Sequence, residues 1–584
     1  MTKTDKFTLE IIGSSLVSAA EEIFAAFGRT SKSPVIYEVL DYSCGIMDYR
    51  GRMIAQANGA PGFLGVLDVA VKDALKKFRA DGFDEGDIIA MNIPHYHGTH
   101  LNDVTLVMPV FYRGKLLAFS ANKGHWSEVG GMHFGSWTSD ATEIYQEGLQ
   151  FPIVKLFRKG KPNEDLFDLI RSNVRTPDMT MGDMEAQAAS LRVGARRILE
   201  LCDKYGLNAV MEYIDWGIER AKLMARKRLK ELPHGKFTVE DTIDDDGITD
   251  TPIPVKATVE ISDDKFAIDL TGSGAQVRGS VNSPYPATVS AARLIMKAVM
   301  GPQSPVNDGD FDSLRLVAPE GSIFNPRYPA PTSTYWEAMM FVTDIVWQAL
   351  APHMPDKLPA GHFLSVCATI VGGVDDKTKQ PFAAVEPQAG GWGGGVNKDG
   401  ESGLVCGGDG ETFIMSNEVL EVRQPIRVEQ YSLNVEDGCG HGMFRGGFGL
   451  VKDYRMSNSE ASFTASFGRS VYPAWGMEGG MKGTPNYFVL MRSGKEPQRM
   501  RKVAAASMKK GELIRLKTGA GGGYGDPLDR DVKRVAWDLR NEYISRQDAE
   551  KIYGFVFQPG SLEPDIAATS NLRNRLKAER KNTL

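Results

Sequence analysis

Cysteine is scarce in this chain, with five residues among 584. The five are widely separated and form no C-x-x-C pair, which favours reduced thiols over a disulfide framework or a zinc finger. The sequence shows no uncharged apolar run near the roughly 20 residues that a membrane span needs. Its first residues are polar, without the apolar core of a signal peptide. We therefore expect a cytoplasmic protein without a membrane partner.

Basic charge and phosphate-binding loops are also lacking. The formal net charge is -6, which gives no electrostatic footprint for nucleic acid. The Lys/Arg-rich run at 222–230 has apolar residues at helical spacing and is typical of a solvated helix face. No G-K-[ST] occurs, and the glycine clusters at 390–395 and 519–527 do not form G-x-G-x-x-G. The sequence thus predicts neither a nucleic-acid partner nor a nucleotide site on this chain.

The length of the chain and the changes in its apolar pattern indicate several domains. A chain of 584 residues exceeds one core and suggests about three or four domains. We expect an α+β fold class, a multi-domain mixed α/β protein with a metal-bearing N-terminal domain and a β-rich C-terminal region. The predicted limits are 1–235 for that N-terminal domain, 236–422 for a middle α+β domain, 423–528 for a glycine-rich β domain and 529–584 for a helical tail.

Apolar periodicity predicts the elements of the N-terminal domain. Asp41 lies inside one predicted strand, 35–48, where a carboxylate among apolar neighbours is costly unless it is paired or bound. We expect further strands at 87–93, 104–111 and 116–122, the last two joined by a turn at 113–115. Helices are predicted at 8–27, 65–83, 184–205 and 208–232.

After Pro233 the spacing of apolar residues changes from a helical pattern to the alternating pattern of strands. It predicts a strand at 237–243 and a hairpin at 255–270, with its turn at Asp263 and Asp264. Helices are expected at 287–300 and 335–351, and short strands with glycine-rich turns from 423 to 525.

Histidine is clustered, since five of the nine histidines lie between His95 and His133. Imidazole commonly ligates metals or transfers protons. His100 and Asp103 converge only if they form a turn, because a strand would point them to opposite faces. His125 follows one hairpin later, so antiparallel return brings it back beside that turn, and Asp41 reaches the same place from a neighbouring strand. Two imidazoles and two carboxylates suit Zn²⁺, Mn²⁺ or Fe²⁺, although polar loop residues bonded to backbone would also explain them.

Further polar residues flank this cluster. Glu128 and Glu147 are candidates for proton transfer or for orienting a ligand histidine, and solvated surface carboxylates are the alternative for each. His95 and His97 alternate along the chain and are candidates for the substrate side of a site, or are ordinary loop histidines.

Collinear blocks from about Asp41 to Tyr553 carry a resemblance. The chain resembles the hydantoinase B/oxoprolinase family through the following blocks: L-D-Y-S-C-G-I-M-D (40–48), G-T-H-L-N-D-V-T (98–105), G-H-W-S-E-V-G-G (124–131), Q-E-G-L (146–149), D-L-T-G-S-G-A-Q-V (269–277), P-V-N-D-G (305–309), P-E-G-S-I-F-N-P (319–326), F-R-G-G-F-G-L (444–450) and G-G-G-Y-G-D-P (521–527).

This resemblance implies the B-type subunit of an ATP-dependent enzyme. Some members open cyclic amides such as 5-oxoproline, N-methylhydantoin or caprolactam, and others carboxylate ketones. ATP and Mg²⁺ would bind to a hydantoinase A-type partner with an actin-like ATPase fold, in an α2β2 heterotetramer. The family's metal ligands match Asp41, His100, Asp103 and His125. Glu128 stands where the family usually has Asp, and P-H-Y-H-G (94–98) replaces a more glycine-rich stretch.

Three functions follow from the resemblance. The leading hypothesis is a lactam hydrolase subunit, in which metal-activated water attacks a substrate phosphorylated by the partner, with Glu128, His97 or His95 in proton transfer. The first alternative is a ketone carboxylase that uses bicarbonate and the same metal to stabilise an enolate. The second is a non-catalytic scaffold whose metal is structural.

Overall fold

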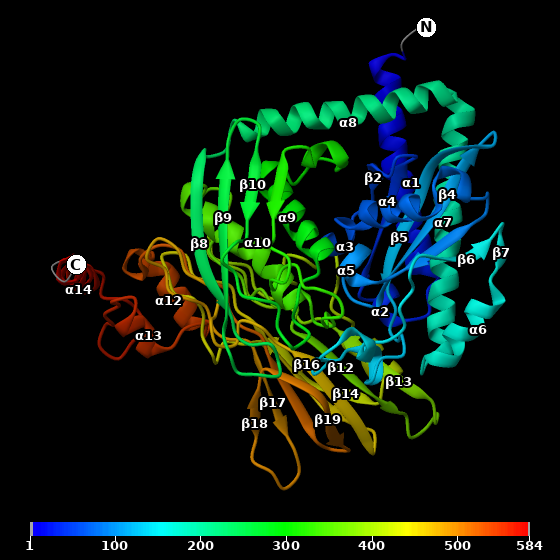
Figure 1. The fold of residues 1–584 in the computed structure, drawn as a ribbon. Helices are drawn as coiled ribbons and strands as arrows, with labels where there is room; N and C mark the ends of the chain where they lie inside the picture. The colour runs from blue at the N-terminus through cyan, green and yellow to red at the C-terminus, as the bar shows by residue number, and fades with distance from the viewer. Residues whose placement is uncertain (1–3, 582–584) are drawn as a thin grey trace.

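The structure is a computed structural model that describes residues 4–581 (Figure 1). Its N-terminal part carries a seven-stranded antiparallel sheet in the order β2-β1-β5-β4-β3-β6-β7. The β4-β5 hairpin turns at Arg113 and Gly114, which both have positive φ, as the sequence predicted. The strands are β1 (Tyr42–Asp48), β2 (Met53–Gln56), β3 (Ile88–Met91), β4 (Asp103–Tyr112), β5 (Lys115–His125), β6 (Val154–Arg158) and β7 (Lys161–Pro162).

Long helices cover this sheet (Figure 1). Helix α1 buries its apolar stripe against α7, and Asp5 caps its N-terminus by accepting from the Thr8 N–H at 3.0 Å. By length and composition alone α1 would also suit a membrane, but 44% of its most apolar window is buried inside the protein, as in a core helix. The helices of this part are α1 (Lys6–Thr30), α2 (Pro34–Tyr37), α3 (Pro61–Leu64), α4 (Leu67–Phe78), α5 (Pro94–His97), α6 (Glu164–Asn173), α7 (Pro177–Tyr205) and α8 (Leu207–Leu229).

The predicted strand at 35–48 is wrong over its first half. Pro34 occupies the first turn of α2, where its fixed φ favours a helix, and Leu40 adopts a left-handed φ of 60°. Strand β1 therefore begins at Tyr42, and Asp41 lies just before it. The Asp41 carbonyl still accepts from the His125 N–H at 3.1 Å, so the two residues remain neighbours.

A second sheet has the order β11-β10-β9-β8, with only β10 and β11 parallel. Helix α10 packs on α9, β8 and β9, and every residue of it except Gln348 is buried. Its mainly apolar sequence has no solvent-facing stripe, as expected of a central helix. The elements are β8 (Gly235–Ile243), β9 (Ile253–Ile261), β10 (Phe266–Asp269), β11 (Leu314–Val317), α9 (Tyr285–Met300) and α10 (Trp336–Leu350).

Two further sheets follow, in the orders β13-β12-β16-β19 and β14-β15-β20-β17-β18. The former joins strands from both sides of residue 423, so the segments predicted as middle and C-terminal domains share a sheet. The strands are β12 (Ala368–Val374), β13 (Pro381–Glu386), β14 (Ile426–Leu433), β15 (Leu450–Met456), β16 (Glu460–Ser466), β17 (Tyr487–Met491), β18 (Gln498–Met500), β19 (Lys502–Lys509) and β20 (Leu513–Lys517); the helices are α11 (Asn417–Arg423), α12 (Val532–Arg540), α13 (Arg546–Lys551) and α14 (Ile566–Lys581).

Short 3-10 helices connect several of these elements. They are η1 (Ala80–Gly82), η2 (Phe134–Ser136), η3 (Ile144–Gln146), η4 (Asp308–Phe311), η5 (Ala351–His353) and η6 (Pro527–Asp529).

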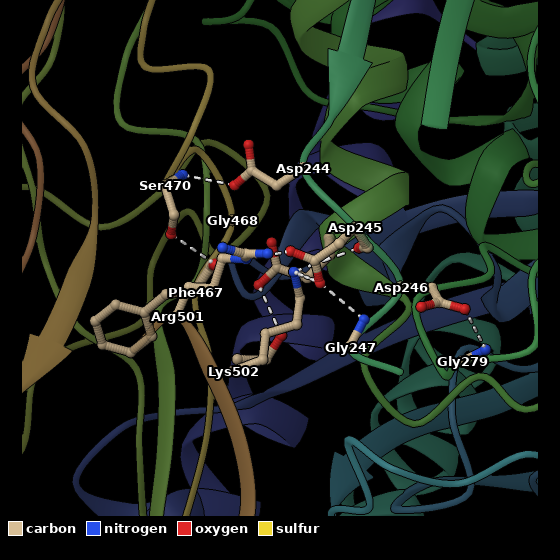
Figure 2. Close-up of polar contacts among 12 residues, drawn as sticks. Asp244, Asp245, Asp246, Gly247, Gly279, Phe467, Gly468, Ser470, Arg501 and Lys502 are labelled. Carbon is tan, nitrogen blue, oxygen red and sulfur yellow. Dashed lines mark hydrogen bonds and ion pairs between the residues drawn. The ribbon is translucent and has the colours of Figure 1, made fainter. Parts of the chain in front are cut away.

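An acidic loop after β8 ties the second sheet to the C-terminal strands (Figure 2). Asp244 accepts from three successive backbone N–H groups, of which the Ser470 bond is 2.6 Å. Asp245 pairs with Arg501 and with Lys502, the latter at 3.1 Å. Asp246 accepts from two N–H groups of its own loop and from the Gly279 N–H at 3.1 Å. Buried carboxylates are tolerated when their oxygens are fully bonded, so this loop holds the two regions in a fixed relation.

Candidate active site

His100, Asp103 and His125 meet at one end of the β4-β5 hairpin. One ligand atom from each lies within 4.8 Å of the others, and the three side chains are at most 2% exposed. The Asp103 N–H donates to the His100 carbonyl at 3.2 Å, which makes the predicted turn, and Asp103 pairs directly with His125 across the ladder. The local geometry inferred from the sequence is therefore present.

Asp103 is held from several sides. Its Oδ1 lies 3.0 Å from His100 Nε2. Its Oδ2 accepts from the Thr99 hydroxyl at 2.5 Å and from the Tyr335 hydroxyl at 3.5 Å, and Lys123 Nζ donates to Thr99 at 3.3 Å. Burial acts to raise the pKa of Asp103, but the charge and hydrogen bond of His100 outweigh it and lower that pKa. Asp103 is thus an oriented carboxylate.

The two histidines each have a ring nitrogen without a hydrogen-bond partner, since the Nδ1 atoms of His100 and His125 are buried and meet none within residues 4–581. Trp137 Nε1 donates to His125 Nε2 at 3.0 Å, and because indole only donates, that histidine nitrogen is the acceptor. Burial lowers the pKa of His125 to about 3, so its imidazole is neutral at neutral pH and carries its proton on Nδ1. His125 would therefore ligate a metal through the Nε2 lone pair that the Trp137 indole meets in this structure.

Asp41 lies beside this cluster and lines the same cavity. Burial raises the pKa of its carboxyl well above the ordinary value, and the charges of Asp103 and Asp409 add to the effect. Grouped buried carboxylates are costly without a compensating cation. The mixed nitrogen and oxygen donors, the unpartnered Nδ1 of His100 and this excess of carboxylates fit a divalent metal ion.

A small cavity of about 40 Å³ opens onto the cluster. Its walls come from the N-terminal sheet, from α10 and from the loop around Asp409, so distant parts of the chain must pack before it exists. The lining residues are mostly apolar: Val35, Val39, Asp41, Ala60, Gly62, Phe63, His100, His125, Trp137, Tyr335, Trp336, Met339, Met340, Val366, Val385, Pro387, Gly408, Asp409 and Thr412.

Glu128, predicted as a base, is not among the cavity-lining residues. Its buried carboxylate accepts from the Gly130 N–H at 2.8 Å, the Ser136 hydroxyl at 2.6 Å and the Arg175 guanidinium at 3.0 Å. A fourth bond, at 3.3 Å, comes from the Gly135 N–H. These contacts hold the loop after β5, and no contact joins the Glu128 carboxylate to His100, Asp103 or His125 among the described residues.

His95 and His97 are also not among the residues that line this cavity. His97 is buried, with Nδ1 3.7 Å from an Asp73 oxygen, and His95 stands edge-on to Tyr328 with ring centroids 5.4 Å apart. Their assignment to the substrate side gains no support from this geometry.

The sequence interpretation missed the contributions of Tyr335, Trp336, Asp409 and Thr412, all of which line the cavity. Asp409 follows a Gly-Gly pair at 407–408, a weak signal for a tight loop. Periodicity contains no information that would connect these positions with the histidine cluster.

Comparison with known proteins assigns the family. Residues 5–527 match the family described as Hydantoinase B/oxoprolinase, and the chain belongs to it. This confirms the resemblance seen in the sequence blocks.

Individual relatives span nearly the whole chain. An uncharacterized protein of Methanocaldococcus jannaschii is 35% identical over 575 residues, which cover 97% of this chain and all of the relative. The caprolactamase subunit beta of Pseudomonas jessenii is 30% identical, covering 97% of this chain and 99% of the relative.

Solved structures share the fold. The crystal structure of ATP-dependent caprolactamase from Pseudomonas jessenii matches with a TM-score of 0.90 and 28% identity, covering 98% of this chain and all of that chain. A nucleotide-free acetone carboxylase matches with a TM-score of 0.91 at 18% identity, covering 99% of this chain and 84% of that chain, a likeness of fold alone. The mixed α/β fold class is thereby confirmed.

Proposed function

We propose that this chain is the B-type subunit of a cytoplasmic, ATP-dependent cyclic-amide hydrolase. A hydantoinase A-type subunit would bind ATP and Mg²⁺ and phosphorylate the substrate, in an α2β2 heterotetramer. The proposal is supported by the family assignment and by the similarity to a caprolactamase subunit over nearly the full length. The observation that carries it is the compact, buried His100, Asp103 and His125 set beside a cavity with mostly apolar walls.

These residues, with Asp41, would hold Zn²⁺, Mn²⁺ or Fe²⁺. Such an ion, when bound, supplies Lewis-acid polarisation and a nucleophile at neutral pH. The protein's own part is orientation. Trp137 holds the ring of His125, and Thr99 holds Asp103. The apolar walls exclude bulk water and strengthen every electrostatic contact inside them.

A ketone carboxylase dependent on bicarbonate is the second candidate. The observation in its favour is the shared fold with acetone carboxylase. At 18% identity that likeness does not extend to chemistry, which places this candidate after the hydrolase.

The test is ATP turnover by the complex of this chain with its A-type partner. The substrates are a panel of lactams, hydantoins and ketones, each with and without bicarbonate. Turnover of a cyclic amide without bicarbonate supports the hydrolase, whereas turnover only of ketones with bicarbonate supports the carboxylase.

The variant His125→Ala tests the metal cluster within the same complex. We expect it to assemble normally but to lose metal and turnover. The matched control is His133→Ala, since His133 pairs with Asp140 at 3.0 Å outside the cluster and should retain both. Full activity of His125→Ala with normal metal content would refute the catalytic site, and normal turnover without any bound metal would show that neither catalysis nor assembly needs the ion.

A further inference from the structure

Besides the Nδ1 atoms of His100 and His125, three polar groups of cavity-lining residues have no hydrogen-bond partner in the described part of the chain. They are the indole N–H of Trp336, the Oδ2 atom of Asp409 and the hydroxyl of Thr412, and each of these atoms is buried. Trp336 and Thr412 are only 5% and 6% exposed. Buried polar groups are nearly always bonded, because an unsatisfied one costs about 1–3 kcal/mol. Three in one cavity therefore indicate a polar ligand.

The loop that carries Asp409 is itself well bonded. The Asp409 N–H donates to the Cys406 carbonyl at 3.1 Å, and the Thr412 N–H donates to the Asp409 carbonyl at 3.0 Å. The loop is also fastened to the N-terminal part, where the Gly62 N–H donates to the Gly408 carbonyl at 3.2 Å. The Cys406 thiol donates a hydrogen bond to the Asp409 carboxylate, and the Oδ2 atom alone is left without a partner within a fixed backbone, which is the arrangement of a preorganised binding group.

The three groups form a complementary set. Indole only donates, a carboxylate accepts, and a hydroxyl does both. In a small ring the amide is cis, so its carbonyl oxygen and its N–H lie on the same side and present one acceptor beside one donor. Trp336 also stands next to the cluster of His100, Asp103 and His125, with its ring centroid 5.6 Å from that of His100, so the indole lies at the end of the cavity where the carbonyl would be attacked.

We propose that the cis-amide edge of the substrate is recognised by this set, with Asp409 binding the ring nitrogen and the Trp336 indole binding the carbonyl oxygen. The inference rests on the proposed function and deepens it, because it names Asp409 as the residue that selects a ring bearing N–H. A ketone has no such donor and would leave Asp409 unpaired, at a cost in specificity.

Asp409 also provides an acceptor for the ring proton. If the ring N–H loses its proton when the carbonyl oxygen is phosphorylated, the Asp409 carboxylate would take that proton, and the resulting carboxyl would donate to the ring nitrogen.

The experiment compares a cyclic amide with its N-methyl derivative in the complex with the A-type partner. The substrates are ε-caprolactam, 2-pyrrolidone and hydantoin, each beside its ring-N-methylated form. Asp409→Ala should reduce kcat/KM for the N–H substrate by roughly 10- to 100-fold, the effect of one hydrogen bond to a charged group. For the N-methyl form the loss should be under about threefold. Asp409→Asn, whose amide oxygen still accepts, should recover part of the N–H activity.

Controls separate binding from folding. Glu411→Ala alters an exposed carboxylate in the same loop and should leave both substrates unaffected. Metal content and melting temperature should be unchanged in Asp409→Asn. An unchanged ratio between N–H and N-methyl substrates in Asp409→Ala would overturn the inference while leaving the hydrolase intact. Failure of the unmodified complex to turn over any cyclic amide would overturn the proposed function and, with it, the inference.

Discussion

Replacing Glu147 with Gln should raise stability at alkaline pH. Glu147 is 1% exposed, and its Oε1 accepts from the backbone N–H groups of Thr332 and Ser333 at 2.7 and 2.8 Å. These residues lead into Tyr335 and Trp336, so the glutamate fastens one wall of the cavity to the N-terminal part. Glutamine keeps Oε1 and both bonds but carries no charge.

The magnitude follows from the pKa. Burial raises the pKa of Glu147 from 4.5 to about 8, although the Ser333 and Thr332 hydrogen bonds act against it. The folded state therefore holds a proton that the unfolded state releases. Its contribution to stability is fully present below pH 4.5 and is lost as pH rises to about 8, by about 1.4 kcal/mol for each pH unit. Over the whole range from pH 4.5 to about 8 the loss of stability amounts to about 5 kcal/mol. This figure is an upper limit, because the protein around a buried charge rearranges to solvate it.

The assay is differential scanning calorimetry of the native protein and Glu147→Gln from pH 5 to pH 9. Other titrating groups are common to both proteins, so the difference in melting temperature isolates Glu147. We expect near-equal melting at pH 5 and a difference that grows steadily in favour of Glu147→Gln up to pH 8. Parallel melting curves across the whole range, or a variant less stable at pH 9, would refute the assignment of a buried, protonated carboxyl.

Two further outcomes follow from the site. Glu128→Ala should lower the unfolding free energy by about 2–4 kcal/mol, because it leaves the Gly130 N–H and the Ser136 hydroxyl without an acceptor. Turnover per folded molecule should persist. A loss of kcat at unchanged melting temperature would instead favour the predicted role of Glu128 as a base. Removing divalent metal with a chelator should lower the melting temperature, and adding metal at about 100 times its Kd should restore about 2.7 kcal/mol of unfolding free energy. If the melting temperature of the native protein changes no more than that of His125→Ala, this would contradict a cation at this cluster.

Much of the N-terminal sheet can be predicted from the sequence, because its strands and turns depend on residues that are close together in the chain. Alternating apolar residues and the turn at Arg113 and Gly114 define the β4-β5 hairpin, and a hairpin brings its two ends together whatever packs on it. The meeting of His100, Asp103 and His125 depends on that register alone. Local propensity misled at 35–48, since β-branched and aromatic residues indicated a strand where Pro34 begins a helix.

The cavity depends on contacts between distant parts of the chain. Trp336 and Asp409 come from segments more than 200 residues beyond His125. The spacing of apolar residues does not predict that α10 and the Asp409 loop pack against the same hairpin. The role of Glu128 also depends on tertiary contacts. Its position in the sequence block 124–131 predicts a site residue, but its carboxylate is bonded to Ser136 and Arg175. The sequence by itself determined the family and the clustering of His100, Asp103 and His125, because hairpin pairing and the order of motifs depend on residues close together in the chain. Only the tertiary structure decided which polar groups are left unpaired in the cavity, because hydrogen-bond satisfaction is a property of packing.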